Sequence, residues 1–198
     1  MKPIYTLTLN PAVDGASETD VVRHTHKVRT TNERYDPGGG GINVARVIIE
    51  LGRPAVPIAM IGGATGGVLD TILRDRGLEP MAIPVAGHTR ISHTVFEHST
   101  GREFRFVAEG PRVTETEWRS CLAAVDTVDC DWLVASGSPP PGLGDAVYAQ
   151  LAERAALSVV RFVLDTSGPS LASALATGHV HLAKPSLGEF RALVDAPL

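Results

Sequence analysis

The chain has 198 residues, of which 43% are hydrophobic and 20% charged, so it can bury a substantial core as one domain or slightly more. Its net charge of -4 argues against a general nucleic-acid or membrane-surface binder, and no apolar run approaches the roughly 18 residues that a membrane span needs. Only two cysteines occur, Cys121 and Cys130, and we interpret both as structural thiols of a protein from the reducing cytoplasm.

Short apolar runs alternate with amphipathic runs along the first part of the chain. The pattern predicts strands at residues 4–9 and 56–61 and helices at 42–51 and 68–76, the second helix being preceded by the loop-like stretch GGATGG. Two later runs, 91–97 and 103–107, are separated by HSTGR and predict a β-hairpin. Thr114 with Glu117 three residues later is a capping-box pattern, which predicts a helix that continues to about Val125.

The alternation resumes in the second part of the chain. It predicts strands at residues 132–135, 159–164 and 180–183, and helices at 146–156, 169–176 and 187–194. Repeated strand and helix units indicate an α/β fold with a mainly parallel, doubly wound sheet covered on both faces. Segments at about 16–36 and 89–108 do not fit the alternation, and we interpret them as extra strands outside the main sheet that form a lid.

The stretch PGGGGIN, residues 37–43, places four glycines directly before a predicted helix. The dinucleotide spacing G-x-G-x-x-G is not cleanly met, and the run lies about thirty residues after the first strand instead of directly behind it. Glycines at a helix N-terminus let backbone N–H groups approach a ligand closely, and Asn43 could add a hydrogen-bonding amide. The alternative is a tight turn that only needs positive φ angles.

Six stretches together resemble the ribokinase or PfkB family of sugar kinases in order and spacing. They are YTLTLNPAVD (5–14), PGGGGINVAR (37–46), GGATG (62–66), SGSPPPG (136–142), LDTSG (164–168) and AKPS (183–186). Within that family they are most similar to the PfkB-type, or minor-isozyme, 6-phosphofructokinases. The resemblance implies one ribokinase-like kinase domain over residues 1–198, with a Rossmann-like core and a small β-sheet lid. It also implies ATP and Mg²⁺ as cofactors and a homodimer formed through the lid.

The resemblance assigns a sugar pocket near the glycine run. Asp14 would bind sugar hydroxyls, and Gly38, Gly39 and Asn43 would line the same pocket. A carboxylate suits this task because it can accept two hydrogen bonds from neighbouring hydroxyl groups. The alternative for Asp14 is a turn-forming residue behind a proline.

Three cations stand where the family is expected to hold a sugar phosphate, namely Lys27, Arg90 and Arg105. Planar guanidinium groups match phosphate oxygens better than a point charge does. In the strand EFRFV, Arg105 would face the cleft while Phe104 and Phe106 face the other side. Taken singly, each of these cations could also be an ordinary surface charge.

The expected nucleotide side is less regular. The resemblance implies that Lys184 and Ser186 lie near ATP, with Ser186 in the place of the usual asparagine, and that Glu189 organises magnesium through water. Asp165, at the end of its strand, is a second candidate near the metal, or else a helix cap. Mg²⁺ keeps most of its waters, so outer-sphere carboxylates are suitable partners.

The family's Gly-Ala-Gly-Asp motif, which supplies the anion hole and the catalytic base, occurs nowhere in the 198 residues. We therefore expect no catalytic residue in this chain, and little or no activity from it alone. The implied function is ATP-dependent phosphorylation of fructose 6-phosphate to fructose 1,6-bisphosphate in glycolysis. The alternatives are a 1-phosphofructokinase, a tagatose-6-phosphate kinase, or a non-catalytic remnant that binds a sugar phosphate or dimerises. His179 and His181 share a face of a predicted strand, but two histidines without a third ligand are a weak metal signal.

Overall fold

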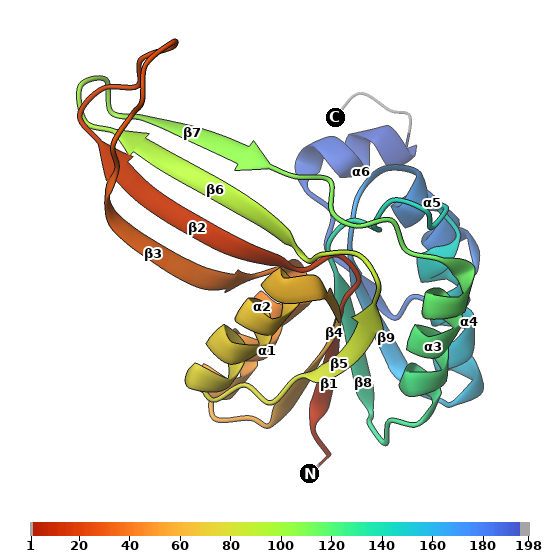
Figure 1. The fold of residues 1–198 in the computed structure, drawn as a ribbon. Coiled ribbons are helices and arrows are strands. Elements are labelled where there is room, and N and C mark those ends of the chain that lie inside the picture. Colours follow the sequence, from red (N-terminus) through yellow and green to blue (C-terminus); the bar gives the residue numbers. More distant parts are fainter. Residues whose placement is uncertain (1, 195–198) are drawn as a thin grey trace.

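The computed structural model describes residues 2–194 and contains two sheets, one inside a helical core and one that projects from it (Figure 1). The core sheet is six-stranded and wholly parallel, in the order β10-β9-β8-β1-β4-β5. Its strands are β1 (Ile4–Thr8), β4 (Ala55–Gly62), β5 (Met81–Val85), β8 (Trp132–Ser136), β9 (Arg161–Asp165) and β10 (Leu182–Ala183). The predicted α/β architecture with a parallel sheet is thereby confirmed.

Helices cover both faces of the core sheet, because its strands bury side chains on both sides. The helices are α1 (Gly40–Glu50), α2 (Gly63–Asp75), α3 (Glu115–Asp126), α4 (Val147–Leu157), α5 (Gly168–Ala176) and α6 (Leu187–Val194). Along β4, Ala59 and Ile61 pack in one apolar cluster with α1 and α2, whereas Ile58 and Met60 pack in the other with α3 and α4. Among residues 2–194, no helix is both long and apolar enough to cross a bilayer.

Local signals fix several helix ends. The side chain of Thr114 accepts a hydrogen bond from the backbone of Glu117, whose carboxylate returns the contact, so the predicted capping box is present. The predicted end of α1 is also present. The backbone of Gly52 has a φ of 78° and donates a hydrogen bond to the carbonyl of Ile49, as expected of a terminating glycine.

The projecting sheet is the lid, in the order β3-β2-β6-β7. Its strands are β2 (Ala12–Thr19), β3 (Thr31–Gly38), β6 (Arg90–Glu97) and β7 (Arg102–Val107). The predicted hairpin of β6 and β7 is antiparallel as expected, while β2 runs parallel to β6. All four strands meet the core at one end of the lid, and the loop between β2 and β3 lies at the other (Figure 1).

Three local expectations were wrong. The stretch GGATGG is not a loop, because α2 already begins at Gly63. The strand β5 was missed, since its sequence MAIPV contains Pro84, which is exposed on an edge strand where no ladder hydrogen bond is needed from it. His179 and His181 precede the two-residue strand β10 instead of lying on it.

Strand order locates the position where a ligand is expected. From β1 the chain winds outward through β4 to β5, then returns to β8 on the other side of β1 and winds outward to β10. Open parallel sheets bind ligands at the carboxyl ends of the strands next to such a reversal. In this chain that position lies between the end of β1 and the end of β8, directly below the lid (Figure 1).

Candidate functional site

The N-terminus of α1 lies against the carboxyl ends of β1 and β8. Its cap residue is Gly39, which has a φ of 124° and offers no side chain to the free N–H groups of the first turn. The hydroxyl of Thr8, from the end of β1, supplies the missing acceptor and lies 3.0 Å from the backbone nitrogen of Ile42. A strand thus caps the helix, and positive φ is needed at Gly39 alone among the four glycines.

The other three glycines are required for close packing. A Cβ atom at Gly40 would overlap the side chain of Ser136, and one at Gly41 would overlap a backbone carbonyl of β1. A Cβ atom at Gly38 would occupy the place of the Asp14 carboxylate. The run therefore brings α1 against the sheet and leaves room for Asp14, so the glycines of PGGGGIN are needed for close packing as well as for turn geometry.

Asp14 lies within β2 and not in a turn, and its side chain is half-buried. Burial raises the pKa of its carboxyl above the ordinary value of 3.8, and the neighbouring Asp36 raises it further, while Arg90 and Arg105 oppose the shift. A partly desolvated carboxylate flanked by two arginines is a typical hydrogen-bond acceptor for a polar ligand.

Asp14 opens into a cavity of about 270 Å³ between the lid and α1. Two further predicted residues, Asn43 and Arg105, line the same cavity. The amide oxygen of Asn43 accepts a hydrogen bond of 3.3 Å from Arg46, which leaves its amide nitrogen as a donor. The structure therefore brings together a carboxylate, an amide and a guanidinium that come from three separate parts of the sequence.

Arg90 lies at the base of the lid and does not line this cavity. Its guanidinium donates 3.0 Å hydrogen bonds to the carbonyls of Asn10 and Ala108, which belong to two other passages of the chain between core and lid. Burial lowers its pKa, and the charge of Asp14 opposes that shift. Arg90 also borders a second hollow of about 500 Å³ beside the loop that contains Ser138.

Lys27 is not brought to the cavity. It is exposed in the loop between β2 and β3, at the end of the lid that points away from the core (Figure 1). Within a single chain the predicted phosphate-binding trio is therefore divided among three places.

The residues expected near the nucleotide gather at the carboxyl ends of β8, β9 and β10. Lys184 lies 3.4 Å from one carboxylate oxygen of Asp165, and the hydroxyl of Ser136 donates a 3.1 Å hydrogen bond to the other. Glu189 accepts a 2.6 Å hydrogen bond from the backbone of Ser186, which lowers the pKa of its carboxyl, and its own backbone donates to the Ser186 hydroxyl. Ser186 and Glu189 thus form a capping box for α6.

Metal ligation by a closed protein shell is not supported. Over residues 2–194 there is no group of three or more His, Cys, Asp or Glu side chains that could hold an ion. Asp165 and Glu189 fit the weaker role of binding the water shell of Mg²⁺, because each carboxylate has capacity beyond the contacts described above.

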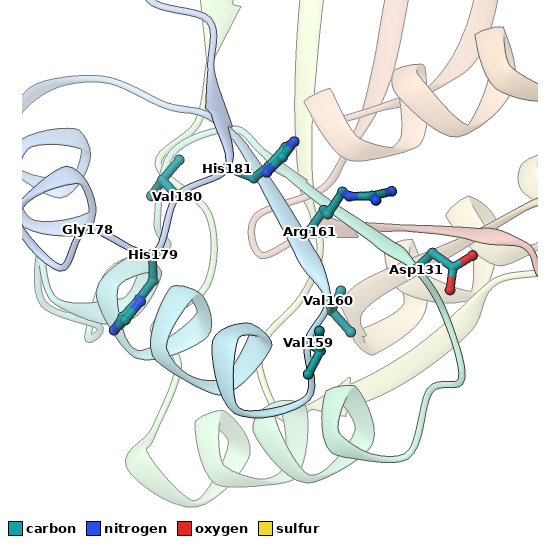
Figure 2. Close-up of a pocket in the computed structure, with 8 residues that line it drawn as sticks. All are labelled: Asp131, Val159, Val160, Arg161, Gly178, His179, Val180 and His181. Carbon is teal, nitrogen blue, oxygen red and sulfur yellow. The ribbon is translucent and has the colours of Figure 1, made fainter.

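A larger hollow, of about 740 Å³, lies at the amino-terminal ends of the core strands (Figure 2). It is lined by the residues that precede β8, β9 and β10, among them Asp131, His179 and His181. The ring of His181 packs edge-on against Trp132 at 5.3 Å, which explains this histidine as a packing residue. Since ligands of such sheets bind at the carboxyl ends, size alone does not make this hollow the functional site.

Sequence reasoning missed several residues of the 270 Å³ cavity. They are Arg34, Asp36, Arg46, Ser92 and Thr94. Strand pairing could have revealed the lid members, because Arg34 is opposite Ala16 and Asp36 is opposite Asp14. That register could not be read from the sequence, since no short turn connects β2 with β3.

Comparisons with known proteins agree with this fold and identify its family. The model of the family described as pfkB family carbohydrate kinase matches residues 7–198. The ATP-dependent 6-phosphofructokinase isozyme 2 of Mycobacterium tuberculosis is 42% identical over 197 residues, which are 98% of this chain and 58% of that protein. Phosphofructokinase-2 of Escherichia coli is 39% identical in two solved structures, a complex with fructose-6-phosphate (TM-score 0.94) and a tetrameric inhibited form (TM-score 0.93). Each structural match covers 100% of this chain and 66% of the solved chain, so the present chain spans about 60% of the length of its relatives.

Proposed function

The chain belongs to the pfkB family of carbohydrate kinases, and on that premise we propose that it provides the sugar-phosphate site of an ATP-dependent 6-phosphofructokinase. The proposed reaction transfers the γ-phosphoryl group of ATP to the 1-hydroxyl of fructose 6-phosphate. The observation that carries the proposal is the cavity in which Asp14, Asn43 and Arg105 meet below the lid. The 39–42% identity to 6-phosphofructokinases of isozyme 2 supports the choice of substrate.

Each group in the cavity suits one part of a phosphorylated ketose. The Asp14 carboxylate can accept hydrogen bonds from two sugar hydroxyls, and the Asn43 amide nitrogen can donate to a third oxygen. Arg105 can bind phosphate oxygens with two parallel N–H groups. The absence of a side chain at Gly38 lets the ligand lie against the Asp14 carboxylate and the first turn of α1.

For the nucleotide we propose a position at the carboxyl ends of β9 and β10. Lys184 and Ser186 would lie beside the ATP phosphates, and Asp165 and Glu189 would hold the waters of Mg²⁺. The metal would neutralise phosphate charge when bound. In the protein alone Lys184 is paired with Asp165, so the lysine is already aligned at this edge before any ligand arrives.

We also propose that two copies associate through the lid. Tyr35 and Phe106 lie in one cross-strand row with Gly15 and His93, and are 50% and 61% exposed; Ile91, in the next row on the same face, is 48% exposed. A face with this much exposed apolar surface is typical of a protein contact. A second copy of the same lid would cover it with matching chemistry, and sedimentation at increasing protein concentration would show a dimer.

Calorimetric titration of the chain with fructose 6-phosphate tests the substrate. We expect binding that exceeds that of fructose 1-phosphate and tagatose 6-phosphate, and that is lost in Asp14→Asn. The matched control is Asp20→Asn, because Asp20 is an exposed carboxylate at the end of β2 away from the cavity. No heat with any of the three ligands at millimolar concentration would contradict the proposal.

Turnover is a separate question for these 198 residues, in which no Gly-Ala-Gly-Asp sequence occurs. We propose that they bind the sugar phosphate without transferring a phosphoryl group, because neither an anion hole nor a base has been assigned among them. A coupled assay for ADP release checks this, and turnover above the background of Asp14→Asn would show the proposal to be wrong.

A further inference from the structure

Arg34 and Arg105 lie at the two ends of one cross-strand row of the lid. In the register of the sheet Arg34 is opposite Ala16, Ala16 is opposite Thr94, and Thr94 is opposite Arg105. Directly paired residues of neighbouring strands point to the same face. Both arginines therefore project from the same surface of the lid, and both line the 270 Å³ cavity.

The two arginines are separated by two residues with short side chains. Their backbones are three strand spacings apart, or about 14 Å, and the two residues between them, Ala16 and Thr94, have short side chains. The long side chains of Arg34 and Arg105 can therefore extend toward each other above these short residues. The adjacent row contains Asp14 and Ser92, so an anion held between the arginines would be next to the group proposed to bind sugar hydroxyls.

Charge in the cavity is unbalanced toward the positive. Its arginines are Arg34, Arg46 and Arg105, and its carboxylates are Asp14 and Asp36. Asp36 forms an ion pair with Arg76, which lies outside the cavity, so Asp14 alone is left to oppose three cations. The two positive charges that remain match in magnitude the charge of about -2 on a phosphate dianion.

Arg34 itself has no ion-pair partner among residues 2–194. Glu18, on the neighbouring strand β2, is held by Asn32 at 2.9 Å and by His98 at 3.2 Å. These hydrogen bonds, together with the more distant charge of Arg34, lower the pKa of its carboxyl. An arginine that lines a cavity without a carboxylate partner is available to an anionic ligand.

We propose that Arg34 is a phosphate-binding residue that acts with Arg105 to hold the phosphate of the substrate within a single chain. The proposal rests on the sugar-phosphate function proposed above and adds a residue to it. It also removes the need for Lys27 of the same chain, which lies at the distant tip of the lid.

The test compares Arg34→Ala and Arg34→Lys with a matched control, Arg29→Ala. Arg29 is also an exposed arginine of the lid, but it does not line the cavity. Loss of a charge-assisted contact predicts that Arg34→Ala weakens fructose 6-phosphate binding about 10- to 100-fold. Arg34→Lys should recover part of the loss, because it keeps the charge without the planar fork. Arg29→Ala should bind within about twofold of the unchanged chain, and urea midpoints verify that all variants are folded.

Inorganic phosphate and fructose, titrated separately, tell the possible failures apart. We expect Arg34→Ala to weaken the binding of phosphate and to leave that of fructose unchanged. If fructose 6-phosphate binds and Arg34→Ala matches Arg29→Ala, the role of Arg34 is wrong and the sugar-phosphate function stands. If only inorganic phosphate binds, in an Arg34-dependent way, the anion site stands and the sugar function fails. If none of fructose 6-phosphate, fructose and inorganic phosphate binds, both the sugar-phosphate function and the role of Arg34 are wrong. If fructose 6-phosphate binding is weakened in Lys27→Ala and not in Arg34→Ala, the role of Arg34 is wrong.

Discussion

The carboxyl-terminal and amino-terminal ends of the core strands border the same apolar core, yet they differ in their polar groups and in how closely the backbones approach. We call these ends the carboxyl edge and the amino edge of the sheet. At the carboxyl edge Thr8 and Ser136 are buried and polar, and Gly40 and Gly41 let α1 touch the strands. At the amino-terminal ends of the strands the turns leave large apolar side chains in water, with Val159 90% exposed beside the 740 Å³ hollow. A site is therefore marked by converging polar groups and close backbones, and the volume of a hollow is a poor guide to it.

The largest expected effect comes from Asp14, which lies in β2 of the lid and lines the 270 Å³ cavity. Asp14→Asn should weaken sugar-phosphate binding about 100-fold or more, because charge-assisted hydrogen bonds to two hydroxyls are lost. Stability at pH 7 should not fall, since the folded pKa is raised and the carboxylate is less favourable in the folded chain than in the unfolded one.

The sign of that shift also fixes a pH dependence. Sugar binding needs the carboxylate, so affinity should fall as pH drops through the folded pKa, which lies above the ordinary 3.8. The stability penalty of the charged form is fully present above the folded pKa and disappears as pH falls toward 3.8. Titrations between pH 7 and 4 check both trends, and a pH profile of binding that survives in Asp14→Asn would point to another group.

A second variant attacks the close approach of α1. Gly41→Ala should reduce the free energy of unfolding by roughly 1–3 kcal/mol, because its Cβ would overlap the backbone of β1. Gly67→Ala is the matched control, since Gly67 lies inside α2 with nothing within 4 Å of a Cβ atom. That change should stabilise by up to about 1 kcal/mol through helix propensity. Urea unfolding of both variants measures the difference, and equal midpoints would mean that the glycine run does not determine the packing.

Thr8 offers a smaller perturbation of the same edge. Thr8→Val keeps the shape but leaves the backbone N–H of Ile42 without its acceptor, which should cost about 1–2 kcal/mol. Thr71→Val, on the exposed side of α2, should change stability by less than about 0.5 kcal/mol. Hydrogen exchange at Ile42 should accelerate in Thr8→Val, and unchanged exchange there would argue against a cap provided by the strand.

The smallest effect is expected at the amino edge and has the opposite sign. Val159 has a φ of 59°, which is strained for a β-branched residue, and its side chain packs little because it is 90% exposed. Val159→Asn should stabilise by up to about 1 kcal/mol and leave sugar binding unchanged. Leu157→Gln removes an equally exposed apolar group without altering such a backbone, and should have no comparable effect on the thermal midpoint.

The core could be predicted from the sequence because its elements are long apolar or amphipathic runs with clear ends. The errors fell where tertiary contacts override local signals. Gly63 begins a helix although glycine is a poor helix former. Glycine is required at this position because a side chain there would overlap His88. The alternative for Asp14, a turn residue behind Pro11, is excluded by the pairing of Asp14 with both β3 and β6.

For the site, prediction depended on how locally each contact is encoded. Of the residues expected at the sugar, Asp14 and Asn43 lie close to the glycine run in the sequence or in the fold, and the structure brings both to one cavity. Arg34 escaped notice because its position depends on a register between strands that are joined by a long loop. The hydrogen bonds of Arg90 to two carbonyls could not be predicted either, because every residue has a backbone carbonyl and the sequence does not indicate which one accepts.

The lid has one more consequence, for building instruments from this protein. All of its passages to the core lie at one end, where Arg90 joins two of them, and the loop between β2 and β3 lies at the other (Figure 1). Exposed loop tips of this kind tolerate inserted sequence well. A fluorophore attached near His26, which is exposed in this loop, would therefore lie at the end of the lid that points away from the core. Energy transfer between such a label and a second label on the core would report the angle between the lid and the core.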